Sequence, residues 1–237
     1  MKCFGRFVMM YSILRQRKEE LDSMIKRKGT VLILLGILMI AAAMCLTAYN
    51  IWDGKRAEQA SNEISEVLIA KISEDDSQSG LQVPMFDPAT PMPVEVIDGY
   101  EYIGVLEIPS LNLSLPVMNE WDYTRLKISP CRFTGSYYAD DLVICAHNYA
   151  THFSPIKWIE IGADVYLTNV EGMSIHYIVT NRETVEPTAV EQMIENTNNS
   201  ETSTLEWDLT LFTCNTGGQT RCAVRCKRME VSDESMG

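Results

Sequence analysis

An uncharged and almost wholly apolar run of 23 residues, Thr30–Trp52, constrains this 237-residue chain more than any other feature. As a helix it would be roughly 35 Å long at about 1.5 Å per residue, enough to cross a hydrocarbon core of ~30 Å. Tyr49 and Trp52 stand at its end, where an interfacial aromatic belt is expected. The alternatives are a buried core helix and a cleaved signal peptide, but Ala41–Ala43 lie too deep in the run for a cleavage site. We therefore predict a transmembrane signal-anchor helix over residues 29–52.

The charges on either side of this run differ in sign. Residues 1–28 carry eight Lys/Arg and three Asp/Glu, whereas residues 53–237 carry 12 Lys/Arg and 29 Asp/Glu. The basic cluster Lys26–Lys28 precedes the run and Asp53 follows it. The positive-inside rule then places residues 1–28 in the cytoplasm and the rest outside, as a single-pass protein of the cell membrane. The acidic exported part argues against nucleic acid as a partner.

Residues 53–98 are expected to form a stalk and a linker. Apolar residues recur at helical spacing in the first part: Ala60, Ile64, Val67, Leu68 and Ile72. This stripe predicts a short stalk helix over Lys55–Ile72. Ser73–Asp98 is acidic and then rich in proline, which is typical of a linker. Its segment Met85–Pro88, with Phe86, Asp87 and Pro88, is either part of a plain tether or a lid over a groove.

Residues 99–237 show the pattern of a β domain. Short apolar runs alternate with clusters of Gly, Asn, Asp and Pro: Tyr102–Ile108, Leu113–Val117, Leu142–Cys145, Val165–Thr168, Ser174–Thr180, Trp207–Thr213 and Arg221–Met229. Thr188 and Glu191 have the spacing of a helical capping box, so Thr188–Glu195 is expected to form a short helix in a connection. We predict a mainly β fold, a closed barrel of about eight strands with one or two short helices.

The last two strands bring a thiol and a guanidinium together. Asp208–Cys214 reads as a strand, Asn215–Thr220 contains a Gly-Gly turn signal, and Arg221 opens the returning strand. If the hairpin closes at Cys214 and Arg221, their Cβ atoms lie ~5 Å apart on one face. A guanidinium there favours the nucleophilic thiolate and can donate to an oxyanion. The alternative is a cysteine and a surface arginine that merely face each other.

A histidine ends another apolar strand. His147 follows Leu142–Cys145 as the chain enters a loop. The pKa of histidine suits proton transfer near neutral pH, and a cysteine enzyme that breaks an amide must protonate the leaving amine. A lone histidine at a strand end more often has a structural role. The combination of Cys214, His147 and Arg221 is what favours catalysis.

Other reactive side chains receive weaker interpretations. Cys145 lies two residues before His147 and is a rival nucleophile, whereas His152 and His176 are expected to be structural. Asp140-Asp141 either binds a cation or is a solvated strand entry. Cys131, Cys222 and Cys226 have no assigned role, and no cysteine and histidine spacing of a zinc site occurs, so no metal site is predicted.

These motifs resemble the sortase family. Thr210–Cys214 (TLFTC) is similar to the sortase signature TLxTC, and Ala146-His147-Asn148 stands 67 residues before Cys214, where sortases have their catalytic histidine. Arg221 stands where the sortase arginine opens the last strand, and the segment YIGVLEIP, which begins at Tyr102, resembles the first sortase strand. The resemblance covers roughly residues 100–230. One departure is Ala146, where many sortases have glycine.

The resemblance implies a cysteine transpeptidase of the Gram-positive cell surface that needs no cofactor. Cys214 would attack an LPxTG-like C-terminal sorting signal of a surface protein, with Arg221 at the oxyanion, His147 as acid and base, and Thr213 in contact with substrate. The acceptor would be an amine of a peptidoglycan precursor or a pilin lysine. An L,D-transpeptidase is disfavoured because its HGC-type motif is absent. The other alternative is a non-catalytic, membrane-tethered binding domain on the same barrel.

Overall fold

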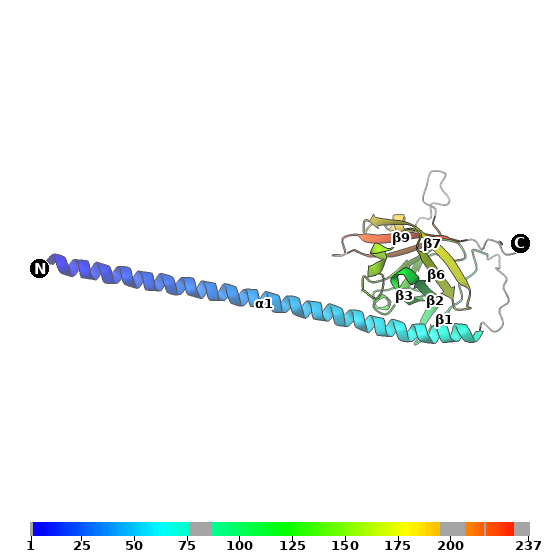
Figure 1. Cartoon of the computed structure of the whole chain (residues 1–237), viewed down its shortest axis with the longest axis horizontal. Coiled ribbons are helices and arrows are strands. Elements are labelled where there is room, and N and C mark those ends of the chain that lie inside the picture. Colours follow the sequence, from blue (N-terminus) through cyan, green and yellow to red (C-terminus); the bar gives the residue numbers. More distant parts are fainter. Residues whose placement is uncertain (1, 76–86, 195–206, 216, 230–237) are drawn as a thin grey trace. The chain divides into compact units, whose positions relative to one another are not determined.

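The computed structural model describes residues 2–75, 87–194, 207–215 and 217–229, and Figure 1 labels their helices and strands. The chain divides into two compact units, Met1–Trp52 and Asp53–Gly237. One helix, α1 (Lys2–Asp75), makes up the described part of the first unit and begins the second. Within it, Lys28–Ser73 is long and apolar enough by length and composition to cross a membrane.

The helix α1 replaces the separate anchor and stalk helices that the sequence predicts. The two predicted segments join and extend back to Lys2. The physical reason is that the first proline of the chain is Pro84, so no residue before it blocks helical hydrogen bonds. The lid alternative for Met85–Pro88 falls largely outside the described residues.

The second half of α1 packs on the β domain through a face that differs in part from the predicted stripe. Ile64 and Leu68 are buried as predicted, but Val67 is 44% exposed. Ala57 and Ser61, which were not predicted, are each 1% exposed. Their small side chains let the helix backbone approach the domain closely. A pattern based on large apolar residues could not detect this contact.

The β domain is a closed barrel, as predicted. Its sheet order is β1-β2-β3-β4-β5-β8-β9-β7-β6, and β2 also pairs with β6, so eight strands close the barrel and β1 adds to β2. The strands are β1 (Glu95–Ile97), β2 (Tyr100–Ile108), β3 (Leu113–Met118), β4 (Cys131–Thr134), β5 (Leu142–Cys145), β6 (Asp164–Asn169), β7 (Ser174–Val185), β8 (Leu209–Cys214) and β9 (Arg221–Arg228). Four short helices accompany them: η2 (Pro109–Leu111), η3 (Arg125–Lys127), η4 (Ser154–Trp158) and α2 (Val190–Ile194).

Three strands differ from the sequence prediction. The short strands β1 and β4 were not predicted, and β7 continues to Val185 instead of ending at Thr180. The second half of β7 alternates exposed polar residues with partly buried ones, so it lacks an apolar pattern. It remains a strand because it pairs with β9 as far as the Val185–Arg221 pair. Pairing with β9 therefore stabilises this half of β7 as a strand, although its local composition does not favour one.

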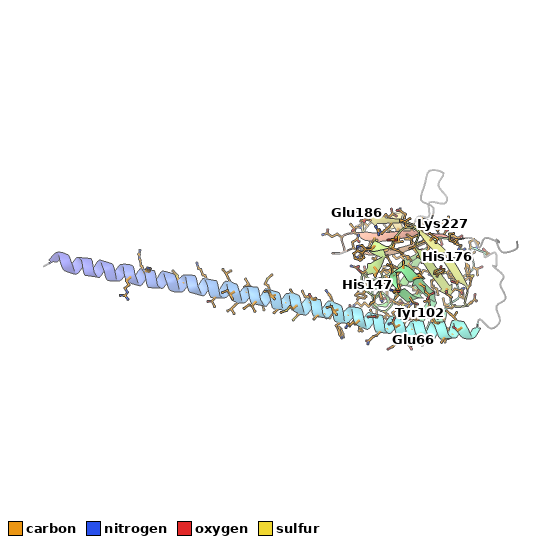
Figure 2. All side chains as sticks on the ribbon, viewed as in Figure 1. Glu66, Tyr102, His147, His176, Glu186 and Lys227 are labelled. Carbon is orange, nitrogen blue, oxygen red and sulfur yellow. The ribbon has the colours of Figure 1, made fainter. Side chains whose placement is uncertain are left out.

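Two buried clusters lie on opposite faces of the central strands. On β5, Leu142 and Ile144 belong to one cluster, and Val143 and Cys145 belong to the other. Phe212 of β8 belongs to the same cluster as Cys145. Because side chains alternate along a strand, Cys214 lies on the same face of β8 as Phe212. The side chains of both faces are drawn in Figure 2.

Candidate active site

The parallel pairing of β5 with β8 brings two strand ends together. The register aligns Cys145 with Phe212, and beyond it the backbone N–H of Ala146 donates to the carbonyl of Phe212 at 3.2 Å. The buried hydroxyl of Thr213 donates to the carbonyl of Ala146 at 2.8 Å. These two bonds hold the residue before His147 beside the residue before Cys214. The histidine and the cysteine therefore leave their strands at the same end of the barrel.

The β8–β9 hairpin pairs Cys214 directly with Arg221, so the predicted register is confirmed. The backbone N–H of Asn215 donates to the carbonyl of Thr220 at 2.9 Å and closes the turn. Nη1 of Arg221 donates to the carbonyls of Gly218 at 2.9 Å and Thr220 at 3.2 Å. No residue that the structure describes accepts a hydrogen bond from its Nε or Nη2. A guanidinium held in this way can direct donors to an oxyanion formed at the Cys214 sulfur.

Arg225 lies four residues further along β9 and has different surroundings. It is 4% exposed. Its Nε donates to Glu183 at 2.8 Å, and Nη1 donates to Thr210 at 2.7 Å and to the carbonyl of Met193 at 3.1 Å. Its guanidinium also lies 5.1 Å from the ring centre of Trp207. These contacts give Arg225 a structural role in joining β9 to its neighbours.

His147 is half-buried and rests on the ring of Tyr149, with 4.9 Å between ring centres. Among the residues the structure describes, none forms a hydrogen bond with the His147 ring. Burial lowers the pKa of His147, the carboxylate of Asp53 raises it, and the ammonium of Lys127 lowers it. The balance favours the neutral imidazole, the form that can accept a proton.

The neighbouring cysteines are poor rivals for the nucleophile. Burial raises the pKa of Cys145 to about 12, and the nearby Cys214 adds to this effect. Burial also raises the pKa of each remaining thiol on the barrel: Cys131, Cys222 and Cys226. Cys214 is half-buried, whereas the other four cysteines of the β domain are buried. Only Cys214 combines access with a nearby arginine, which is what a reactive thiolate needs.

The other predicted candidates have protein partners. Nε2 of His176 lies 2.8 Å from Asp164, and Ser136 N–H donates to Asp141 at 2.8 Å. Asp140 forms an ion pair with Arg228 at 3.1 Å. Over the described ranges, no group of three His, Cys, Asp or Glu side chains is arranged to hold a metal ion.

The family model of the sortase domain matches residues 106–229, which is just over half of the chain. The chain belongs to the sortase family. Sortases are cysteine transpeptidases, and this activity follows for the chain. The resemblance noted in the TLFTC motif is thereby confirmed.

Solved structures of sortases are similar to this one. Sortase C1 from Streptococcus suis is 26% identical, covers 58% of this chain and 78% of its own, and gives a TM-score of 0.45. Sortase C from Streptococcus pneumoniae is 22% identical, covers 73% and 97%, and gives 0.49. Sortase A from Corynebacterium diphtheriae is 18% identical, covers 78% and 94%, and gives 0.48. No curated protein gives a significant match.

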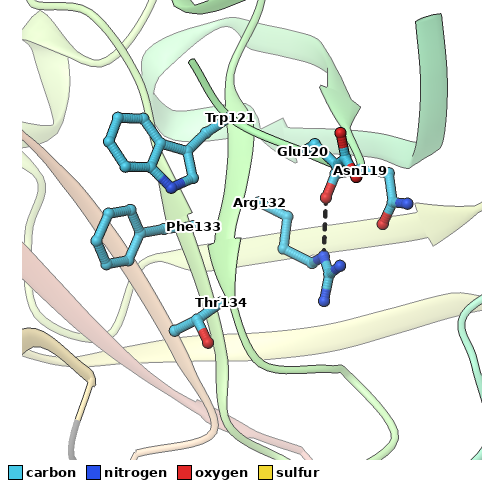
Figure 3. Close-up of a pocket in the computed structure, with 6 residues that line it drawn as sticks. All are labelled: Asn119, Glu120, Trp121, Arg132, Phe133 and Thr134. Carbon is cyan, nitrogen blue, oxygen red and sulfur yellow. Dashed lines mark hydrogen bonds between the residues drawn. The ribbon is translucent and has the colours of Figure 1, made fainter. Parts of the chain in front are cut away.

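The sortase barrel also carries a hollow that the sequence analysis did not predict. It has a volume of about 360 Å³ and is shown in Figure 3, with these residues around it: Asn119, Glu120, Trp121, Arg132, Phe133 and Thr134. The ring of Phe133 packs against Trp121 at 5.2 Å and against Phe212 at 5.3 Å. Phe212 shares a strand face with Cys214. These ring contacts therefore join the hollow to β8, the strand that ends at Cys214.

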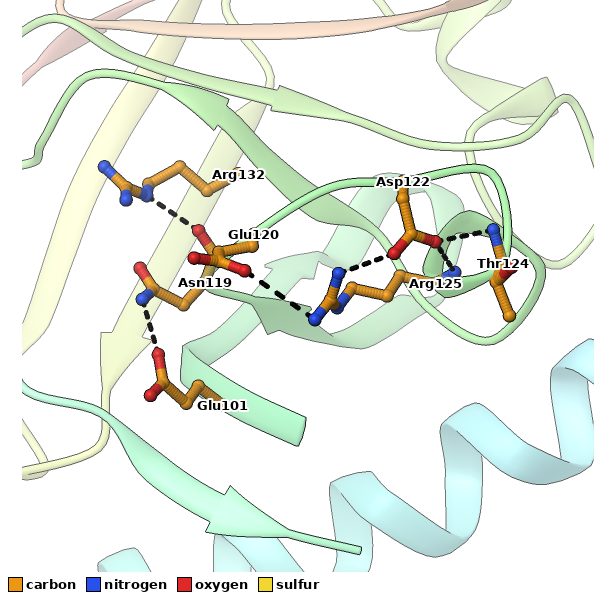
Figure 4. A network of polar contacts seen from close by, with 7 residues as sticks. All are labelled: Glu101, Asn119, Glu120, Asp122, Thr124, Arg125 and Arg132. Carbon is orange, nitrogen blue, oxygen red and sulfur yellow. Dashed lines mark hydrogen bonds and ion pairs between the residues drawn. The ribbon is translucent and has the colours of Figure 1, made fainter. Parts of the chain in front are cut away.

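Polar contacts hold the rim of this hollow. Nε of Arg132 donates to the carbonyl of Asn119 at 2.9 Å, and the Asn119 side chain donates to Glu101 at 2.8 Å. Arg125 forms ion pairs with Glu120 and Asp122, as Figure 4 shows. Of the aromatic residues at the hollow, Trp121 follows the predicted strand Leu113–Val117, but the sequence alone does not place it beside Phe133.

Proposed function

We propose that this sortase cleaves an LPxTG-like C-terminal sorting signal through a thioacyl-enzyme on Cys214. The observation that carries the proposal is the direct pairing of Cys214 with Arg221, next to the strand end that bears His147. Thr213 is proposed to contact the signal through its backbone, since its hydroxyl is bonded to the carbonyl of Ala146. The domain needs no cofactor for this chemistry.

In the first half-reaction, the Cys214 thiolate attacks the threonine carbonyl carbon of the signal. Arg221 donates hydrogen bonds to the resulting oxyanion. The carbon–nitrogen bond then breaks, and His147 as imidazolium gives its proton to the departing amine. The surface protein remains attached to Cys214 as a thioester.

In the second half-reaction, an amine attacks the thioester. His147, now neutral, takes the proton from the attacking nitrogen, and Cys214 leaves as a thiolate. The net result is one amide broken and another formed, with no oxidant or reductant. We propose that the amine belongs to a peptidoglycan precursor or to a pilin lysine.

We further propose that the chain spans the membrane once, with the catalytic domain on the outer face. Residues 1–28 would be cytoplasmic, 29–52 would span, 53–98 would be stalk and linker, and 99–237 would form the catalytic domain. The charge difference across the apolar run supports this orientation. External protease on spheroplasts should digest the domain and spare residues 1–28. Protection of the domain would contradict the orientation.

The activity is tested by mass spectrometry of the full chain incubated with a library of sorting-signal peptides. The expected result is a covalent acyl adduct on Cys214 that disappears when an amine is added and is absent from Cys214→Ala. Adducts that persist in Cys214→Ala would contradict the assignment of the nucleophile. A non-catalytic binding domain would instead form no adduct and would show no selective labelling of Cys214 by a thiol probe.

A further inference from the structure

Tyr149 links the proposed catalytic histidine, His147, to Asp53, the first residue of α1 after the apolar run. Its ring lies between two imidazoles, at 4.9 Å from His147 and 5.4 Å from His152. Its hydroxyl donates a hydrogen bond of 2.6 Å to Oδ2 of Asp53. Asp53 is 96 residues away in the sequence and lies on the helix that precedes the barrel.

Asp53 is held in place by the way α1 packs. Ala57 and Ser61 follow it at intervals of four residues, so the three share one helix face, and both are almost fully buried against the domain. The Asp53 side chain is itself only 17% exposed. Its other oxygen lies 3.6 Å from Arg56 on the same helix. The carboxylate thus sits at the end of a docked helix face and not on a free surface.

Two charged groups and one neutral imidazole surround His147. Asp53 on α1 carries a negative charge, Lys127 on η3 carries a positive charge, and the buried His152 is neutral at physiological pH because burial lowers its pKa to about 4. Among the described residues, Asp53 is the one acidic group that influences the pKa of His147. Without the Asp53 carboxylate, burial and the Lys127 ammonium would both lower the pKa of His147 with no acidic group to oppose them.

We propose that Asp53 and Tyr149 are positioning residues for His147, so that the docked α1 helix completes the active site. Asp53 holds the phenol, the phenol ring sets the plane of the imidazole, and the carboxylate favours the imidazolium that protonates the leaving amine. The ring contact matters because the His147 ring has no hydrogen bond to the residues that the structure describes. This inference rests on the proposed role of His147.

The test uses the full chain in detergent or nanodiscs. The variants are Asp53→Asn, which keeps an acceptor without the charge, Asp53→Glu, which restores the charge, and Tyr149→Phe, which keeps the ring without the hydroxyl. The control is Glu66→Gln, which removes a carboxylate from an exposed position on the same helix (Figure 2). The chain has three histidines, so ring carbon–proton NMR signals can follow their titration, with His147→Gln identifying the relevant one.

We expect Asp53→Asn to lower the pKa of His147 by roughly half a unit, less than the effect of a directly opposed charge. The alkaline limb of kcat/KM should move to lower pH by the same amount, and Asp53→Glu should restore most of it. Tyr149→Phe should lower kcat roughly fivefold with little change in KM, since His147 acts after the signal is bound. Glu66→Gln should match the wild type.

An unchanged His147 titration in Asp53→Asn would overturn the electrostatic part of the inference. An unchanged kcat in Tyr149→Phe would overturn the positioning part. Because the titration needs no sorting signal, it remains informative if no signal peptide is cleaved. A wild type that forms no acyl adduct would instead contradict the proposed function.

Discussion

Cys214 and Arg221 face each other directly across the β8–β9 hairpin, whereas Arg225, on the same strand, is enclosed by Glu183, Thr210 and Trp207. Because side chains alternate along a strand, both arginines lie on one face of β9, but their contacts differ. Arg221 lies beside Cys214, the proposed nucleophile, whereas Arg225 is held by contacts within the fold. This difference can be tested because activity and stability should respond separately.

Replacing Arg221 should affect turnover and not folding. Arg221→Ala is expected to lower the rate of peptide transfer by roughly two to three orders of magnitude, the scale of losing one oxyanion donor. Arg221→Lys should recover little, because an ammonium lacks the planar fork of the guanidinium. Thermal unfolding of both variants should stay close to that of the wild type, since the bonds of Arg221 to described residues are to carbonyls of its own turn.

Replacing Arg225 should have the reverse effect. Arg225→Ala leaves Glu183 and the Thr210 hydroxyl without their partner and is expected to cost roughly 3 kcal/mol of unfolding free energy. The folded fraction should retain most of its turnover. Denaturant unfolding and peptide transfer, measured on the same preparations, give the two quantities. If Arg225→Ala lost turnover while Arg221→Ala kept it, the assignment of the oxyanion donor would be wrong.

The hydroxyl of Thr213 should contribute to both stability and turnover. Thr213→Val keeps the shape but removes the bond to the buried carbonyl of Ala146, which should cost about 1–2 kcal/mol. Since this bond joins the strand ends that carry His147 and Cys214, turnover should fall as well. Thr213→Ser retains a hydroxyl and is the matched control. Equal behaviour of the Val and Ser variants in unfolding and transfer assays would contradict this role.

The sequence predicted the hairpin register because two local signals agree there. The run Thr210–Cys214 reads as a strand, and Gly217-Gly218 marks the turn, so a hairpin closing at Cys214 and Arg221 was the hypothesis, and the structure confirms that register. Closure of the barrel was predictable from the number of short strands. These features depend on local composition, which a single sequence reveals.

The link between α1 and His147 could not be predicted in this way. Asp53 and Tyr149 are 96 residues apart, and neither stands in a recognisable motif. The helix face that docks contains Ala57 and Ser61, whose small side chains carry no strong periodic signal. Contacts of this kind arise from tertiary packing. The same holds for β4, which is a strand because β5 lies beside it.

Among the cysteines of the β domain, Cys214 should react fastest with a thiol reagent. At about pH 8, iodoacetamide is expected to modify Cys214 of the native protein much faster than Cys145, because burial raises the pKa of Cys145 to about 12. Cys145→Ala should keep transfer activity and lose about 1 kcal/mol of stability through the small cavity. Peptide mapping by mass spectrometry identifies the modified thiol. Rapid labelling of Cys145 in the folded chain would restore it as a rival nucleophile.

The buried His152 should make the protein sensitive to acid. Burial lowers the pKa of His152 to about 4, with the nearby His147 adding to the effect, against a usual value of 6.5. Between these two values the unfolded chain binds a proton that the folded chain does not, so stability falls as the pH falls through this window. The loss should reach about 3 kcal/mol by pH 4. His152→Gln cannot titrate and should show a flatter dependence in denaturant unfolding at each pH. Parallel curves for the two proteins would show that the acid sensitivity arises elsewhere.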